Sequence, residues 1–270
     1  MPSYERIIVA GAPGSSKTHS WLTIAEALPN SMFYVFDPED GVERIRAASF
    51  PQVKNICYYF TPFWFRKLEQ IGERRWFGGV SEATSKIKQD VKPNDWVIVE
   101  SLPSMWDTAQ SGFVGAIWDK GIGEYFLERR KTMENAGAKS KRLEAFDGWR
   151  DWGVIKKMHN DDFIIPICFQ LPVHSYMTSS LSVTTMGEKE KEDPDIRGFY
   201  GDSLVRVDGE KRNVFRVQTI LIFYGNKKTG WSYSTFVKDR GNREWKDKAP
   251  LVNFAAQYLG GVAKMPGILG

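Results

Sequence analysis

The stretch that most constrains the fold lies at the start of the chain. Residues 4–10 form an apolar run that predicts a strand, and residues 11–18 follow as Gly-Ala-Pro-Gly-Ser-Ser-Lys-Thr. A helical pattern begins at the last two of these, Lys17 and Thr18. Strand, small-residue loop and helix in this order are the context of the phosphate-binding motif G-x-x-x-x-G-K-[ST], the P-loop. Backbone N–H groups of the loop and of the helix N-terminus can converge on phosphate oxygens, and Lys17 adds a positive charge.

One position departs from this motif. Ser16 stands where the motif has glycine, so the backbone there has to tolerate a Cβ atom. We still expect a nucleotide site, with the hydroxyl of Thr18 on Mg²⁺. The alternative is an ordinary strand, turn and helix with a chance Lys-Thr pair. The predicted nucleotide-binding residues are Gly11, Ala12, Pro13, Gly14, Ser15, Ser16, Lys17, Thr18 and His19.

Length and composition set wider limits. The 270 residues suffice for one large α/β domain, and 42% hydrophobic residues support a buried core. A net charge of +4 is compatible with nucleic acid without requiring it. Cys57 and Cys168 lie in apolar runs, so we expect both to be reduced core residues. No histidine pairs with a cysteine at metal-ligand spacing, and no leader or membrane-spanning run is visible, so we expect a cytoplasmic protein (the host cytoplasm if viral).

Strands alternate with helices along most of the chain, which predicts an α/β fold with a mostly parallel sheet flanked by helices. After the first strand, predicted strands cover residues 31–36, 53–60, 96–101 and 163–170, and a C-terminal antiparallel hairpin covers 214–224 and 231–238. Predicted helices cover residues 17–28, 42–48, most of 64–91, most of 103–159 and 251–259.

We expect a single domain over residues 1–270. It carries a helical insertion, rich in basic and aromatic residues, at about 103–160. Residues 171–202 lack periodicity and are rich in Ser and Thr, which predicts a mobile loop. The Gly- and Pro-containing segment 261–270 is expected to be a flexible tail.

Acidic residues follow two predicted strands at the edge where the P-loop lies. Glu39, in Asp37-Pro38-Glu39, could polarise the water that attacks a γ-phosphate. Its alternative is an acidic cluster at a helix N-terminus. Glu100 ends the strand over residues 96–99, where it could support Mg²⁺; otherwise it is a solvated carboxylate at a strand end.

Polar and basic residues follow two later strands. Gln170 ends the predicted strand 163–170 and could sense the γ-phosphate, or it is a surface glutamine. Lys238 and Arg240 point the same way on an extended chain and could reach a neighbouring subunit's γ-phosphate. Charges on an edge strand that prevent aggregation are the alternative use of this pair.

The order and spacing of these features resemble the RecA-like recombinase ATPases. That resemblance covers roughly residues 5–240, and the chain looks most like the small bacteriophage members that act in single-strand annealing. It implies a RecA-like P-loop core with Glu39 as catalytic base, Glu100 on the metal, Gln170 as sensor and Lys238/Arg240 acting across a subunit interface. It also implies ATP and Mg²⁺ as cofactors, single-stranded DNA as partner and a homo-oligomer, as a filament or a ring. Ser16 and Glu100 depart from the family pattern.

Evidence for nucleic acid in the residues themselves is indirect. Residues 128–157 carry nine basic side chains beside Trp149 and Trp152, which could track a phosphate backbone and stack on bases. The alternative is a solvated helix face with the tryptophans packed inward. Any contact by residues 171–202 would use Tyr176, Arg197, Tyr200 and backbone amides.

The sequence therefore predicts an ATP-dependent, single-stranded-DNA-binding ATPase without a membrane partner. Two other functions stay open. One is a nucleotide-binding assembly or regulatory protein with weak or no hydrolysis, which the departures at Ser16 and Glu100 would suit. The other is a nucleotide kinase with Arg129-Arg130 in a lid, which leaves the late hairpin without a purpose.

Overall fold

The computed structural model describes residues 4–60, 75–76, 80–135, 151–226, 231–240, 249–250 and 254–262. The strands are β1 (Arg6–Gly11), β2 (Phe33–Phe36), β3 (Ile56–Phe60), β4 (Arg75–Trp76), β5 (Trp96–Val99), β6 (His174–Ser179), β7 (Leu181–Val183), β8 (Val205–Val207), β9 (Thr219–Asn226), β10 (Trp231–Asp239) and β11 (Ala249–Pro250). The α-helices are α1 (Lys17–Ala27), α2 (Val42–Ser49), α3 (Val80–Asp90), α4 (Leu102–Trp118), α5 (Ile122–Asn135), α6 (Asp151–His159), α7 (Met186–Lys189), α8 (Pro194–Tyr200), α9 (Asn213–Arg216) and α10 (Phe254–Val262).

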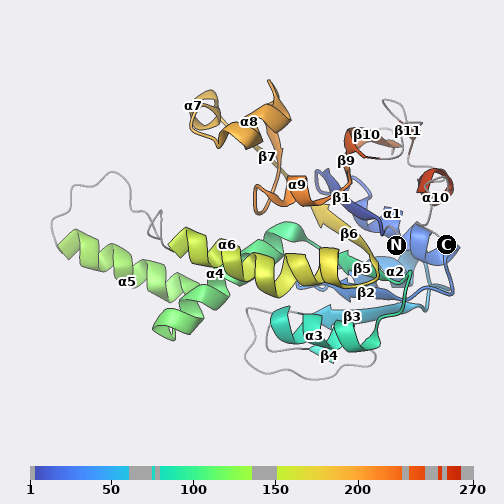
Figure 1. Ribbon diagram of the computed structural model, residues 1–270, viewed down its shortest axis with the longest axis horizontal. Coiled ribbons are helices and arrows are strands. Elements are labelled where there is room, and N and C mark those ends of the chain that lie inside the picture. Colours follow the sequence, from blue (N-terminus) through green and yellow to red (C-terminus); the bar gives the residue numbers. More distant parts are fainter. Residues whose placement is uncertain are drawn as a thin grey trace.

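Nine of the described strands form one sheet in the order β11-β10-β9-β1-β6-β5-β2-β3-β4 (Figure 1). Neighbours from β9 to β4 pair in parallel, and β10 pairs antiparallel with β9. The predicted α/β class, the mostly parallel sheet and the C-terminal antiparallel hairpin are thus confirmed. Because the carboxyl ends of parallel strands share one edge, the residues after β1, β2, β5 and β6 meet there.

Helices cover both faces of this sheet and bury a core on each. On one face, Trp21 of α1, Val42 of α2 and Phe254 of α10 pack on inward residues of the central strands. On the other face, Ile87 of α3 and Met105 of α4 do the same. Strands buried on both faces explain why the sequence shows continuous apolar runs rather than alternation.

The predicted strand over residues 163–170 is wrong. The segment continues α6 as two π-helical turns, Asn160–Ile164 and Pro166–Gln170. The sequence holds the reason, because the buried residues Phe163, Ile164, Ile167 and Cys168 recur at helical spacing. A short apolar run fits either structure, and here the run packs one helical side against the sheet.

The sequence predicted a mobile loop over residues 171–202, and this prediction is wrong because the segment has regular structure. They contain β6, which is fully buried and lies between β1 and β5. After β6 the chain leaves the sheet as β7, α7, α8 and β8, residues 181–207, which we call the arm; it projects from the body in Figure 1. β7 and β8 pair antiparallel, and Arg206 binds Glu192 through two contacts of 3.0 and 2.8 Å, both side chains nearly inaccessible.

The described part of the insertion predicted at about 103–160 consists mainly of the helices α4, α5 and α6. These helices bury a small cluster of their own around Phe113, Tyr125 and Ile155, and they extend from the body in Figure 1. Trp152 stacks on Trp106 at 6.0 Å and 18°, so this tryptophan packs inward, as in the alternative considered for the basic stretch. The predicted contact residues Lys139, Lys141, Arg142, Trp149 and Arg150 lie outside the described residues.

The late hairpin, the two cysteines and the helix before β5 were also predicted from the sequence. The late hairpin begins at Thr219 rather than at 214, because residues 213–216 form α9. Cys57 and Cys168 are both free thiols, the latter buried. Of the predicted helix over 64–91, residues 80–90 form α3, whereas residues 75–76 form the strand β4. Residues 61–74, 77–79 and 263–270 of the predicted tail fall outside the described residues. In the part of the chain that the structure describes, no helix is long and apolar enough to cross a membrane.

Candidate nucleotide site

The P-loop lies between the end of β1 and the start of α1, as the sequence predicts. It is tightly packed: a Cβ atom on Gly11 would lie 2.4 Å from Ser15 Oγ and 2.6 Å from the carbonyl oxygen of Phe223. Gly14 and Ser16 both have positive φ, +77° and +69°. At this position the motif has glycine because the backbone is left-handed, and Ser16 adopts the same left-handed conformation.

Lys17 reaches back over this loop. Its ammonium donates hydrogen bonds of 2.8 and 3.0 Å to the carbonyl oxygens of Gly11 and Ala12. Burial lowers the pKa of Lys17, and the nearby carboxylates of Glu100 and Glu39 partly offset that effect. The lysine and both predicted carboxylates thus converge at the mouth of the loop.

Glu100 is fixed at the end of β5 by two donors from α1. The Thr18 hydroxyl donates to Oε1 at 3.0 Å, and Trp21 Nε1 donates to Oε2 at 3.0 Å. Burial raises the pKa of Glu100 to about 7, although both hydrogen bonds act against this shift. Thr18 and Glu100, which the sequence assigns to Mg²⁺, are thus hydrogen-bonded to each other.

Asp37 and Glu39, which follow β2, lie in different surroundings. Asp37 is fully buried and accepts hydrogen bonds from the backbone N–H groups of Gly41 (3.1 Å) and Val42 (2.9 Å), at the start of α2. This is the helix N-terminal position of the alternative reading. Glu39 is exposed, and its Oε1 accepts a 2.6 Å hydrogen bond from Ser104 of α4. Of these two carboxylates, Glu39 is therefore the one that solvent and a ligand can reach.

Gln170 is not part of this site. It is exposed at the end of the second π-helical turn, and it precedes β6. Since β6 begins beside Arg6 at the start of β1, Gln170 lies at the opposite edge of the sheet from the P-loop. The prediction that Gln170 ends a strand beside the phosphates is therefore wrong, because the strand that fills this place is β6.

Lys238 and Arg240 also lie away from the P-loop of their own chain. β10 runs antiparallel, so Lys238 pairs with Ile220 and Arg240 donates its N–H to Gln218, near the start of β9. Lys238 Nζ donates to the carbonyl oxygen of Val214 at 2.7 Å, and burial with the neighbouring Arg240 lowers its pKa to about 8. Action on a neighbouring subunit's γ-phosphate stays a prediction.

The residues that do end β6, the strand beside β1, were not predicted from the sequence. Ser180 donates a 2.8 Å hydrogen bond to Asp208 Oδ2, and Ser179 donates a 2.9 Å hydrogen bond to the carbonyl oxygen of Asp208. Thr178 contacts Glu100 and lowers its pKa. The run over residues 174–179 is compatible with a buried strand, but its Ser and Thr content is typical of loops, so the sequence favoured a loop.

The donors present suit a phosphate and a magnesium ion. The loop offers Lys17 and backbone N–H groups for phosphate oxygens. The oxygens of Thr18 and Glu100 are of the hard type that Mg²⁺ prefers. Among the described residues, no group of three or more His, Cys, Asp and Glu side chains could hold a metal by itself. Mg²⁺ at this site would therefore take further ligands from phosphate and water, as is usual for this ion.

No protein-family model and no curated protein matches the sequence. Among solved structures, the chain is similar to a KaiC-like protein from the hyperthermophilic archaeon Pyrococcus horikoshii, with 12% identity and a TM-score of 0.46 over 91% of this chain and 84% of that one. It is also similar to the RadB recombinase, with 13% identity and a TM-score of 0.44 over 91% and 86%. Similarity this distant leaves function to be read from the residues of the chain.

Proposed function

We propose that the protein binds ATP with Mg²⁺ at residues 11–19 and hydrolyses it. The observation that carries this proposal is the convergence of Lys17, Thr18 and Glu100 on a loop that ends a parallel strand and begins a helix. A chance Lys-Thr pair does not account for the carboxylate held 3.0 Å from Thr18 by a strand 82 residues away.

Each side chain has a specific part in this proposal. Lys17 neutralises charge on the β- and γ-phosphates once a phosphate replaces the loop carbonyls as its partner. Thr18 and Glu100 would hold Mg²⁺, which supplies a positive charge on the phosphate oxygens as the bond to the leaving group breaks. Glu39, exposed and held by Ser104, orients and deprotonates the attacking water.

We further propose that the ATPase acts on single-stranded DNA, in recombination or annealing, and works as a homo-oligomer. In the oligomer, Lys238 and Arg240 of one subunit would complete the site of the next, which suits their place far from their own P-loop. This part of the proposal also rests on the resemblance of the motif order to bacteriophage annealing ATPases.

ATP turnover, measured with and without single-stranded DNA, tests this function. We expect Glu39→Gln to lower turnover by about 100-fold or more while ATP still binds, because the amide cannot accept a proton from water. Asp40→Asn, a change of the neighbouring exposed acid, is the matched control and should turn over normally. Binding without turnover in the wild type would favour a regulatory nucleotide-binding protein, and phosphate transfer to a nucleoside monophosphate would favour a kinase.

A further inference from the structure

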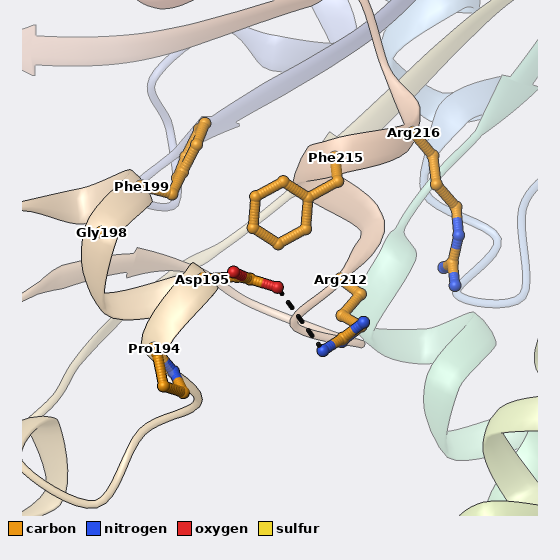
Figure 2. Close-up of a pocket in the computed structure, with 7 residues that line it drawn as sticks. All are labelled: Pro194, Asp195, Gly198, Phe199, Arg212, Phe215 and Arg216. Atoms are coloured by element: carbon orange, nitrogen blue, oxygen red, sulfur yellow. Dashed lines mark ion pairs between the residues drawn. The ribbon is translucent and has the colours of Figure 1, made fainter.

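An open pocket of about 570 Å³ lies between α8 of the arm and α9, away from the P-loop. Figure 2 shows its main side chains: Phe199 from α8, Phe215 and Arg216 from α9, Arg212 just before α9, and Asp195 at the start of α8. None of these residues takes part in the proposed ATP site. The size is in the range of pockets that bind small organic groups.

One wall of the pocket is aromatic. Phe199 and Phe215 meet edge to face, with ring centroids 5.6 Å apart and an interplanar angle of 74°. Both side chains are half-buried, so each ring is held in place and keeps part of its surface open. Positioned rings of this kind are platforms on which an unstacked nucleobase can lie.

The other wall carries two guanidinium groups, each oriented by an acid. Arg212 contacts Asp193 at 2.6 Å and Asp195 at 3.9 Å, and its side chain is 51% exposed. Arg216 contacts Glu210 at 3.1 Å and Asn213 Oδ1 at 2.7 Å. A guanidinium has more N–H donors than these contacts use, so both can still bind an anion.

The backbone joins this pocket to the end of β6. Asp208, which binds Ser180 there, comes four residues before Arg212 on the same connection. Opposite this connection, Arg206 and Glu192 lock β8 to the segment that enters α8. The aromatic and cationic walls are therefore both held by fixed elements rather than by free loops.

We propose that this pocket binds one nucleotide of a single-stranded nucleic acid. The base lies against Phe199 and Phe215, and the phosphate lies against Arg212 and Arg216. A nucleotide brings a planar ring and an anion on one ligand, which is what the two walls offer together. Asp195 accepts hydrogen bonds only, and every base has N–H donors on its edge. A duplex does not fit, because its bases are stacked and their faces are covered.

This inference deepens the proposed function and rests on it. Binding is measured by fluorescence anisotropy on labelled single strands of about 12 nucleotides, DNA and RNA of the same sequence, because either could supply this chemistry. Phe199→Ala should weaken binding by about tenfold, the typical loss of one base-stacking contact. Arg212→Gln should weaken binding and reduce the slope of log K against log salt by about one.

Controls separate a lost contact from a lost fold. Phe169→Ala changes a ring that is 49% exposed near the start of β1, and it should bind like the wild type. Phe199→Trp keeps a stacking surface and should retain binding, even if Phe199→Ala loosens the arm. All of these variants should keep the wild-type rate of ATP turnover in the absence of nucleic acid.

Two results would overturn the inference. If both Phe199→Ala and Arg212→Gln bind nucleic acid with wild-type affinity, the pocket is not the binding site, while the proposed function stands. If these variants also lose self-association in sedimentation, a second copy of the chain occupies the pocket. A wild-type protein that turns over ATP but binds neither DNA nor RNA overturns the pocket and the nucleic-acid partner, and leaves the ATPase intact.

Discussion

The hydroxyl of Thr18 donates a 3.0 Å hydrogen bond to Oε1 of Glu100 and so joins the first turn of α1 to the end of β5. The second oxygen of this carboxylate accepts from Trp21, one turn further along α1. The glutamate is therefore held directly against the residue that the motif assigns to Mg²⁺. Its longer side chain, compared with an aspartate, spans the gap to Thr18 without a bridging group.

Glu100→Gln tests the metal part of this site. The amide keeps the size of the side chain and can keep one hydrogen bond from α1, but it lacks the charge that favours a divalent cation. We expect the Mg²⁺ concentration for half-maximal ATP turnover to rise by about tenfold, as for loss of a supporting ligand. Glu26→Gln, an exposed acid on the same helix, is the control. An unchanged Mg²⁺ requirement would remove Glu100 from the metal site.

Ser16→Gly tests the cost of the departure from the motif. A non-glycine residue in the left-handed region costs about 1–2 kcal/mol, and the extra freedom of glycine in the unfolded chain returns part of that. We expect the variant to gain about 0.5–1 kcal/mol in the free energy of unfolding, measured by urea denaturation. Ser16→Ala removes the same hydroxyl but keeps the left-handed strain. If alanine stabilises as much as glycine, backbone strain is not the reason.

Glu5→Gln tests a buried acid directly before β1, at the edge of the sheet opposite the P-loop. Glu5 is 1% exposed and accepts a 2.7 Å hydrogen bond from Thr219, and burial raises its pKa from 4.5 to about 7. Between these values the folded protein keeps a proton that the unfolded chain has released. Stability from this group is therefore present below pH 4.5 and is lost as the pH rises through 7.

Full ionisation of Glu5 in the folded protein costs about 3 kcal/mol by this linkage. The Gln variant cannot ionise, so its free energy of unfolding should change less between pH 5 and pH 8 than that of the wild type. Urea denaturation at both pH values measures the difference. Glu124→Gln, an exposed acid of α5, should leave the wild-type pH dependence in place, and equal slopes in Glu5→Gln and wild type would contradict the assignment.

The buried pair in the arm predicts an asymmetric mutational result. Glu192→Gln leaves the Arg206 guanidinium buried beside Tyr200 without its counter-charge, and removal of one partner of such a pair costs about 3–5 kcal/mol. We expect faster amide hydrogen exchange across residues 181–207 and unchanged exchange in β1. The double variant Glu192→Met with Arg206→Met should restore most of the protection, because apolar side chains of similar volume need no partner. Slow exchange in the single variant would mean that the pair does not hold the arm.

Local chemistry explains how far the sequence could predict this structure. The P-loop, the strand that ends in Glu100 and the parallel sheet follow from motifs and apolar runs that are compatible with only one kind of local structure. Residues 163–170 were compatible with two structures, because a short apolar run fits a strand or one side of a helix. Their packing against the sheet decided between these two. β6 was missed for the converse reason: the buried hydroxyls of Thr178 and Ser179 donate to the carbonyl oxygens of Val99 and Asp208, which are distant in sequence.

The same limit applies to the site. Glu39 and Glu100 were predictable from their places after strands at one edge of the sheet. The cap that Asp37 forms on α2 is local, because its partners Gly41 and Val42 follow within five residues. The Ser180–Asp208 contact and the Phe199–Phe215 pocket depend on tertiary placement, and no local pattern encodes them.

The most direct test of the central claim is calorimetric titration of the protein with ATP and Mg²⁺. We expect the wild type to bind ATP, and Lys17→Ala to bind it at least about tenfold more weakly, because the variant loses a charge-assisted contact with phosphate. Lys54→Ala, a change of an exposed lysine before β3, should bind like the wild type. Equal affinity in Lys17→Ala and wild type would contradict the assignment of residues 11–19 as the nucleotide site.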